Sequence, residues 1–376
     1  MKNQAGTILA LTTIFSALAL VSAFGTNLPN NISVFATGLN NPRGLKFGPD
    51  GNLYVAEGGI GGTQSTVGCC EQAAGAGPYT GSITGSRISK IDPNGVRTTA
   101  VDNLPSSQTN PQIGSLISGA SDVAFIGNTL YVLLAGAGCS HGVPQVPQMP
   151  NGVIRVNADG TTDLVANLSA FSMAFPVAHP DTGDFEPDGT WYSMVPARGD
   201  GNQVDLYAIN PNHQELVLFS PTTGEMSRVV DFSVSYPGDT NWIGPTAIAT
   251  RNNDKFYVGT LTRFPIVPGS AKIFEVSRDG HIRIVAEGLS AVTGVAFDSQ
   301  HRMYVLEMST SAGGPHPGDG KVVRVDHPGH QTEIASGLTF PTAMTFGPNG
   351  ALYVSHKGFG FPAGQGEILL ITVPQN

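Results

Sequence analysis

Charged residues are scarce in this chain of 376 residues: only 12% are Asp, Glu, Lys or Arg, and Lys and Arg never occur in a run. With a net charge of −9, the chain lacks the basic surface that nucleic-acid-binding proteins present. It also lacks a Gly-x-Ser-x-Gly nucleophile motif and a glycine loop followed by Lys and Ser or Thr. These absences argue against nucleic-acid binding, an α/β-hydrolase and a phosphate-binding loop.

Cysteine is equally rare, with Cys69, Cys70 and Cys139 the three in the chain. They fall in two long segments that should be neighbours in the fold described below, so in an oxidising compartment we expect a disulfide between Cys139 and either Cys69 or Cys70. Zinc is disfavoured, because three thiols with only His141 nearby lack the paired spacing of structural sites. The loop histidines are expected to be solvated; these include His141, His179, His213, His316, His327 and His330.

The N-terminus has the pattern of a secretory signal peptide. Lys2 precedes an uncharged stretch, residues 5–21, that is rich in Leu and Ala, and small residues end it at Ala23. We expect cleavage near Ala23, a secreted or periplasmic monomer of residues 24–376, and no membrane segment after cleavage. A retained membrane anchor is the alternative, but the stretch is short for a span and is interrupted by Thr and Ser.

The chain does have a repeated phrase, Leu-Tyr-Val, preceded each time by a short apolar run. Its copies lie at 53–55 and 352–354, with weaker copies at 130–132, 206–208, 256–258 and 303–305. A repeat at intervals of roughly 40 to 80 residues, in a chain with 48 Gly and 27 Pro, indicates a radial array of sheets. Asp-Gly and Asn-Gly pairs between apolar runs predict tight hairpins.

We therefore predict an all-β fold, a six-bladed β-propeller of four-stranded antiparallel blades, forming a single domain over residues 24–376. The last unit runs out of chain after its third strand, residues 367–373. The N-terminal segment Asn31 to Leu39 is similar to the outer strands of other units and is expected to complete the last blade, which closes the ring.

Long connections between second and third strands should share one face of such a propeller, which we call the long-loop face. They are residues 58–85, 135–152, 263–270, 308–320 and 357–364. Long loops on a rigid scaffold are a usual place for binding functions. We expect a small polar molecule or a protein to bind there.

The residues that end the second strands should form a ring near this face, and most of them are polar: Glu57, Leu134, Asn210, Thr260, Glu307 and His356. Glu57, Asn210 and Glu307 belong to alternate blades, and their oxygens suit a hard cation such as Ca²⁺. The alternative is that these side chains cap neighbouring loop backbone or meet water.

A second ring precedes the inner strands, with Arg43, Ser121, Thr246, Thr293 and Thr342 at equivalent positions and Asp122 one place later. The hydroxyls are expected to bond to turn backbone. Arg43 is the single cation of this ring, so the alternative hypothesis is that it binds an anionic or polar ligand over the channel mouth.

The stretch from Gly38 to Gly59, the Pro78-Tyr79-Thr80-Gly81 insertion and the Thr262-Arg263-Phe264-Pro265 stretch resemble the ScyD/ScyE family of secreted bacterial propellers, within the broader NHL-like and TolB-like six-bladed group. The resemblance covers nearly the whole mature chain. It implies a secreted or periplasmic propeller, and it carries over no catalytic residues.

Three functions follow as hypotheses. The preferred one is a non-enzymatic binding or scaffold propeller that uses the long-loop face. The second is a calcium-dependent hydrolase similar to lactonases and gluconolactonases, with Glu57, Asn210 and Glu307 as ligands and His356 or Asp122 in proton transfer. The third is a quinone-dependent sugar dehydrogenase, for which the chain offers His356, Arg43 and Arg263.

Overall fold

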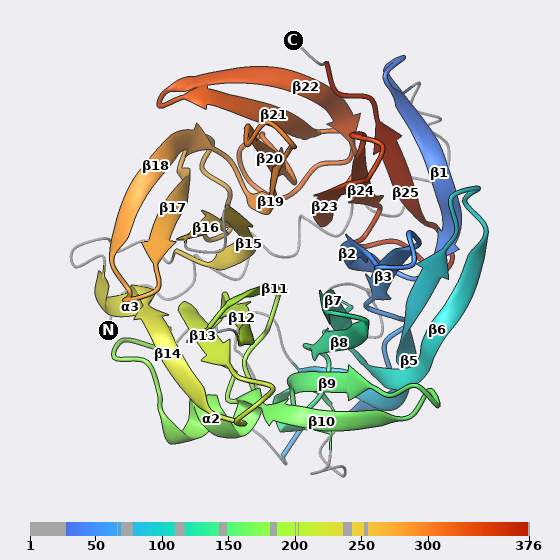
Figure 1. The fold of residues 1–376 in the computed structure, drawn as a ribbon, viewed down its shortest axis with the longest axis vertical. Coiled ribbons are helices and arrows are strands. Elements are labelled where there is room, and N and C mark those ends of the chain that lie inside the picture. Colours follow the sequence, from blue (N-terminus) through green and yellow to red (C-terminus); the bar gives the residue numbers. More distant parts are fainter. Residues whose placement is uncertain are drawn as a thin grey trace, which may run out of the picture.

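Six antiparallel sheets surround a central axis and form a six-bladed β-propeller, which confirms the predicted fold (Figure 1). A computed structural model describes residues 28–65, 67–68, 78–109, 117–142, 149–180, 186–199, 201, 203–235, 243–251 and 255–374. The predicted signal peptide therefore lies outside the described residues. Among those residues, no helix has the length and apolar character needed to cross a membrane.

Each blade has four main strands, listed from the channel outward. Blade 1 contains β2 (Pro42–Phe47), β3 (Leu53–Glu57), β5 (Thr80–Ile91) and β6 (Arg97–Gln108), with the short β4 (Gln64–Ser65) added beside β5. Blade 2 contains β7 (Ala120–Ile126), β8 (Thr129–Leu134), β9 (Gly152–Val156) and β10 (Thr162–Asn167). Blade 3 contains β11 (Ser193–Arg198), β12 (Val204–Asn210), β13 (Glu215–Phe219) and β14 (Met226–Asp231).

The second half of the ring repeats this plan. Blade 4 contains β15 (Pro245–Arg251), β16 (Lys255–Thr260), β17 (Ala271–Ser277) and β18 (Ile282–Leu289). Blade 5 contains β19 (Val292–Phe297), β20 (Met303–Glu307), β21 (Gly320–His327) and β22 (His330–Leu338). Blade 6 contains β23 (Ala343–Phe346), β24 (Leu352–His356), β25 (Gly366–Ile371) and the N-terminal β1 (Ile32–Leu39). The described residues also form three short helical segments, η2 (Cys139–His141), α2 (Leu168–Ala174) and α3 (Phe232–Ser235).

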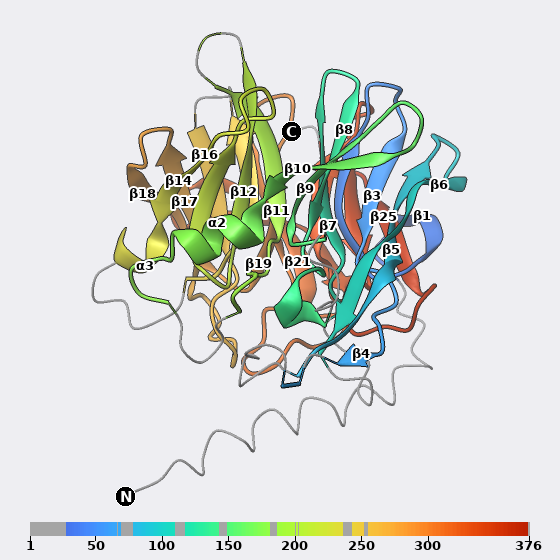
Figure 2. The ribbon, with the colours of Figure 1, turned by 90° about the horizontal axis from the view of Figure 1, so that it is seen from below.

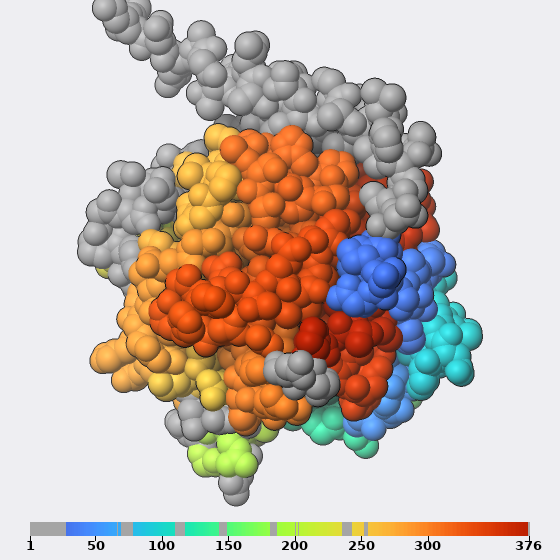
Figure 3. Space-filling view, turned by 90° about the horizontal axis from the view of Figure 1, so that it is seen from above, coloured from blue at the N-terminus to red at the C-terminus, as the bar shows by residue number. Residues whose placement is uncertain are grey.

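The two ends of the described chain meet in blade 6. β1 pairs antiparallel with β25, with Ile32 opposite Ile371 and Leu39 opposite Gly366. The surface view shows the first described residues, in blue, lying against the last ones, in red (Figure 3). The backbone groups of β25 are thereby paired on both sides, so the blade has no open edge at that strand.

The core is divided into inter-blade layers, because each sheet packs its faces against its two neighbours. One hydrophobic cluster fills each of the six interfaces. At four of these interfaces, the tyrosine of the Leu-Tyr-Val phrase packs edge-on against a phenylalanine of the next blade. That phenylalanine is the last or the second-to-last residue of the inner strand. The pairs are Tyr54–Phe125, Tyr257–Phe297, Tyr304–Phe346 and Tyr353–Phe47, with ring centroids 4.8 to 5.0 Å apart. The repeat is thus a packing device.

The inner strands β2, β7, β11, β15, β19 and β23 line the channel (Figure 1). The connections from second to third strands gather on one face, where β4 lies (Figure 2). The first of these connections is not wholly a loop as its sequence suggests, because β5 begins at Thr80 and extends beyond β3 to pair with β4.

Candidate functional site

Each predicted ring residue ends the second strand of its blade, and three of them anchor the chain that enters that blade. Glu57, Glu307 and His356 each accept a hydrogen bond from the backbone N–H of the residue 17 positions earlier, over 2.6, 2.6 and 2.8 Å. The donors are Asn40, Ser290 and Thr339. These side chains therefore hold the crossover from the preceding blade.

The same three side chains also bind the third strand of their own blade. Arg87 Nε lies 2.9 Å from Glu57 Oε1, and Lys321 Nζ lies 3.4 Å from Glu307 Oε2. Burial raises the pKa of Glu307, although Lys321 opposes this. Burial lowers the pKa of His356 and so favours neutral imidazole. Since His356 Nε2 accepts from backbone, its Nδ1 carries the proton and donates to Glu367 Oε2, 3.0 Å away.

The remaining polar members of the ring are used in the same local way. Asn210 Oδ1 accepts the backbone N–H of Thr190 over 3.2 Å, and Thr260 Oγ1 accepts that of Lys272 over 3.0 Å. Leu134 is buried in the core between blades 1 and 2. The predicted calcium ligands Glu57, Asn210 and Glu307 are not brought together by any shared contact between described residues. Nor do these residues include a group of three His, Cys, Asp or Glu placed to hold a metal.

The second predicted ring forms a belt of hydroxyls that links successive blades. Thr246, Thr293 and Thr342 each donate to the carbonyl just before the equivalent residue of the next blade, over 2.6, 3.1 and 2.6 Å. The acceptors are Val292, Pro341 and Pro42. This belt joins blade 4 to blade 5, blade 5 to blade 6, and blade 6 to blade 1.

The belt is interrupted in blades 1 to 3. Arg43 donates to the Ile117 carbonyl, and Ser121 donates within its own blade. At the third position Tyr192 reaches across the ring, where its hydroxyl donates to the Thr342 carbonyl of blade 6 over 3.3 Å. Burial lowers the pKa of Arg43 and raises that of Tyr192, and the contact between the two groups opposes both shifts. Arg43 and Tyr192 thus lie together at the channel mouth.

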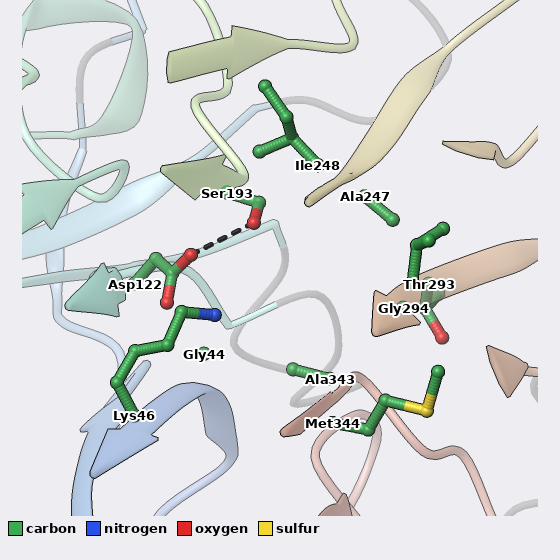
Figure 4. A pocket seen from close by; sticks show the side chains of 11 residues that line it. Gly44, Lys46, Asp122, Ser193, Ala247, Ile248, Thr293, Gly294, Ala343 and Met344 are labelled. Atoms are coloured by element: carbon green, nitrogen blue, oxygen red, sulfur yellow. Dashed lines mark hydrogen bonds between the residues drawn. The ribbon is translucent and has the colours of Figure 1, made fainter. Parts of the chain in front are cut away.

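One residue further along each inner strand, small side chains leave space in the channel. This level contains Gly44, Asp122, Ser193, Ala247, Gly294 and Ala343. With Lys46, Ile248, Thr293, Val295 and Met344 they line an open-sided pocket whose empty space, open solvent at its mouth included, is about 250 Å³ (Figure 4). We call this cavity the channel chamber. Its wall is polar where blades 1 to 3 contribute and mainly apolar where blades 4 to 6 contribute.

Asp122 is held by neutral donors and is 1% exposed. Its Oδ1 accepts the N–H of Val123 over 2.8 Å, and its Oδ2 accepts the Ser193 hydroxyl and the Met194 N–H over 2.9 and 2.8 Å. A glycine is required beside it, because a Cβ added at Gly44 would lie 2.0 Å from Asp122 Oδ1. The close approach of blade 1 to blade 2 therefore fixes the carboxylate.

Lys46 extends from β2 into the chamber (Figure 4). Within the part of the chain that the structure describes, no hydrogen bond or ion pair is made by its ammonium group. Sequence reasoning identified Arg43 and Asp122 but missed Lys46, Tyr192 and Ser193. Lys46 could have been found by aligning the repeats, because the equivalent positions in the other blades are Ala, Val or Thr and Lys46 is the single charged residue among them.

A second polar cluster clamps the blade 2 insertion onto the segment that enters blade 3. His141 Nε2 lies 3.2 Å from Glu186 Oε2, and Ser140 Oγ donates to Asp188 Oδ2 over 2.6 Å. His141 and His213 are buried, so the expectation that they are solvated loop residues is wrong. Burial opposes protonation of His141, but Glu186, Asp188 and the Gly189 carbonyl together outweigh it and raise the pKa of His141.

Cys139, which precedes this clamp, is disulfide-bonded. Its two possible partners in the chain, Cys69 and Cys70, lie outside the described residues, so the choice between them stays a prediction. The disulfide adds a covalent tie close to the contacts of Ser140 and His141.

Comparisons with known proteins show the fold and no family. No family model and no curated protein matches the chain. A putative glucose dehydrogenase from Thermus thermophilus is 14% identical with a TM-score of 0.54, over 91% of this chain and 99% of that one. An auxiliary nutrient binding protein from Bacteroides thetaiotaomicron is 8% identical with a TM-score of 0.53, over 91% and 76%. At these identities the chain shares a six-bladed propeller fold with its structural neighbours, and the resemblance to the ScyD/ScyE family remains a prediction.

Proposed function

We propose that this protein is an exported, non-enzymatic binding propeller that holds a small polar molecule in the channel chamber. The observation that carries the proposal is the break in the hydroxyl belt. Blades 4 to 6 use threonine to join neighbouring blades, whereas blades 1 to 3 place Arg43, Asp122 and Tyr192 at or next to the same level. These three residues also make contacts between blades, but two of them are charged, so one half of the channel wall carries charge.

Joining blades does not require a charge, as the threonines of blades 4 to 6 show. A charge in a protein interior is costly unless it is paired or well hydrogen-bonded. Asp122 meets that condition, whereas Lys46 is only partly buried and lines the chamber without a partner among the described residues. A concave site with a few convergent polar groups and apolar walls is the usual form of a small-molecule site.

The hydrolase alternative receives no comparable support. It requires Glu57, Asn210 and Glu307 to direct oxygens at one ion that polarises a substrate carbonyl. These side chains instead accept backbone N–H groups of the segments that enter their blades. His356, its candidate for proton transfer, binds Thr339 and Glu367.

Filling the chamber tests the proposal. Purified protein is screened by thermal shift against carboxylates, amino acids, sugars and Ca²⁺, and each binder is repeated with Ala343→Leu, which adds bulk to the chamber wall. A ligand that binds in the chamber should raise the Tm of the native protein by mass action. The same ligand should leave the Tm of the Ala343→Leu variant unchanged. Ala170→Leu adds the same bulk to the exposed side of α2 and should behave like the native protein. A panel without binders, or binders that stabilise both variants equally, would contradict the proposal.

A further inference from the structure

We infer that the ligand of the channel chamber is a short-chain carboxylate, with its charged group on Lys46 and its tail against the apolar wall. This inference rests on the proposed function and adds the chemical class of the ligand. Three observations carry it: the charge balance of the chamber, the division of its wall, and the closure of its mouth.

The charge balance favours an anion. Asp122 receives three neutral donors, so its negative charge is already stabilised within the protein. Arg43 donates to a carbonyl oxygen, and Lys46 has no partner among the described residues. Lys46 in the chamber and Arg43 above it are therefore two cations near one carboxylate, Asp122. Asp122 forms no ion pair with either of them among the described residues.

Two other cations of blade 1 behave differently, while Arg97 donates to the Ser89 hydroxyl. Arg87 lies 2.9 Å from Glu57, and Lys90 lies 2.7 Å from Asp50, so both have a carboxylate partner. Lys46 shares their blade and lacks such a partner among the described residues, although it lines a cavity in the channel. A carboxylate supplied by a ligand would give Lys46 the charge-assisted hydrogen bond that the other two have.

The wall opposite Lys46 selects an apolar tail. Ile248, Val295 and Met344 contribute hydrophobic side chains from blades 4 to 6 (Figure 4). Ala247, Gly294 and Ala343 beside them are small and leave the space that a tail would fill. A sugar would place hydroxyls against this wall without partners, which costs free energy.

The closure of the mouth keeps the ligand short. Tyr192 crosses from blade 3 to the Thr342 carbonyl of blade 6, and Arg43 lies beside it. The empty space of the chamber, open solvent at its mouth included, is about 250 Å³, so the space within its walls is smaller than this. A long acyl chain would have to displace Tyr192.

Isothermal titration calorimetry with acetate, propionate, butyrate, hexanoate and neutral butyramide tests the inference. Affinity should rise from acetate to butyrate by about fourfold for each methylene group, as expected for burial of apolar surface. Hexanoate should bind more weakly than butyrate, and butyramide should bind more weakly still because it lacks the charge.

Variants of Lys46 make the result specific. Lys46→Met should weaken butyrate binding by about tenfold or more, the loss expected for one charge-assisted hydrogen bond. Lys46→Arg keeps the charge and should retain binding, which also shows that the position tolerates substitution. Lys90→Met removes the same charge from the same blade outside the chamber and should leave binding unchanged.

The outcomes separate this inference from the proposed function. If the binders are neutral or cationic and Ala343→Leu abolishes their binding, the chamber is a binding site and the carboxylate inference is wrong. The inference also fails if butyrate binds Lys46→Met as tightly as the native protein. If no compound binds, both proposals fail.

Discussion

Replacing Gly44 by alanine should destabilise the propeller through a single misplaced methyl group. The added Cβ would lie 2.0 Å from Asp122 Oδ1, 2.4 Å from its Cγ and 2.7 Å from its Cα. Rotating the Asp122 side chain would relieve the first two contacts, but not the third, which involves backbone. Blades 1 and 2 would therefore have to move apart as well.

The magnitude follows from two contributions. Overpacking in a close-packed interior costs about 1 to 3 kcal/mol. A displaced Asp122 would weaken its hydrogen bonds from Ser193 and Met194, and a bond to a charged group contributes about 1.5 to 3 kcal/mol. Because the contributions overlap, we expect the free energy of unfolding to fall by about 3 to 5 kcal/mol.

The fold supplies a matched control on the other side of the channel. Gly294 occupies the equivalent position in blade 5, and a Cβ there would lie 3.1 Å from side-chain atoms of Leu306 and Met344. Small side-chain movements relieve such contacts, so Gly294→Ala should cost about 1 kcal/mol or less. Urea denaturation followed by the fluorescence of Trp191, which is fully buried between blades 2 and 3, measures both variants. If Gly44→Ala costs no more than Gly294→Ala, the close approach of Gly44 to Asp122 does not fix the carboxylate.

Two further predictions concern the clamp between the blade 2 insertion and blade 3. Despite burial, Glu186 with Asp188 and Gly189 raises the pKa of His141 above 6.5, and His141 with Thr190 and Tyr79 lowers the pKa of Glu186 below 4.5. The pair therefore stabilises the fold most between pH 4.5 and pH 6.5. The free energy of unfolding should fall as the pH rises above 6.5 and as it falls below 4.5. Urea denaturation of the Glu186→Gln variant at several pH values should show a free energy of unfolding that depends less steeply on pH on both sides of this range. An unchanged dependence on pH would contradict the pairing. Reducing the Cys139 disulfide should lower the unfolding free energy by about 2 to 5 kcal/mol, while Cys139→Ser should no longer respond to the reductant.

The fold could be predicted from the sequence because its main determinant is periodic. The tyrosine of each Leu-Tyr-Val phrase needs a neighbour on the next blade, and pairs such as Tyr353 with Phe47 recur around the ring. Counting the phrase therefore counts blades. The same alignment located the ends of the second strands correctly at Glu57, Glu307 and His356.

What the alignment could not supply is the direction in which a side chain bonds. Glu57 and Glu307 were candidate metal ligands by residue type, yet both reach back to backbone donors 17 positions earlier. That choice depends on the path of the crossover between blades, which the repeat does not encode. His141 was misjudged for a similar reason, since its burial depends on Glu186 from another blade.

The contrast between recurring and singular residues explains why the chamber, rather than the ring, is the better candidate site. Glu57 and Glu307 occupy equivalent positions in two blades and make equivalent contacts, as residues do when each blade meets the same structural need. A ligand on the axis of the channel breaks this equivalence, because one molecule cannot meet six blades in the same way. Residues selected by a ligand should therefore be those that occur once among the equivalent positions and face the axis. Lys46 satisfies both conditions, whereas Asp122, which also lines the chamber, is already held by Val123, Ser193 and Met194.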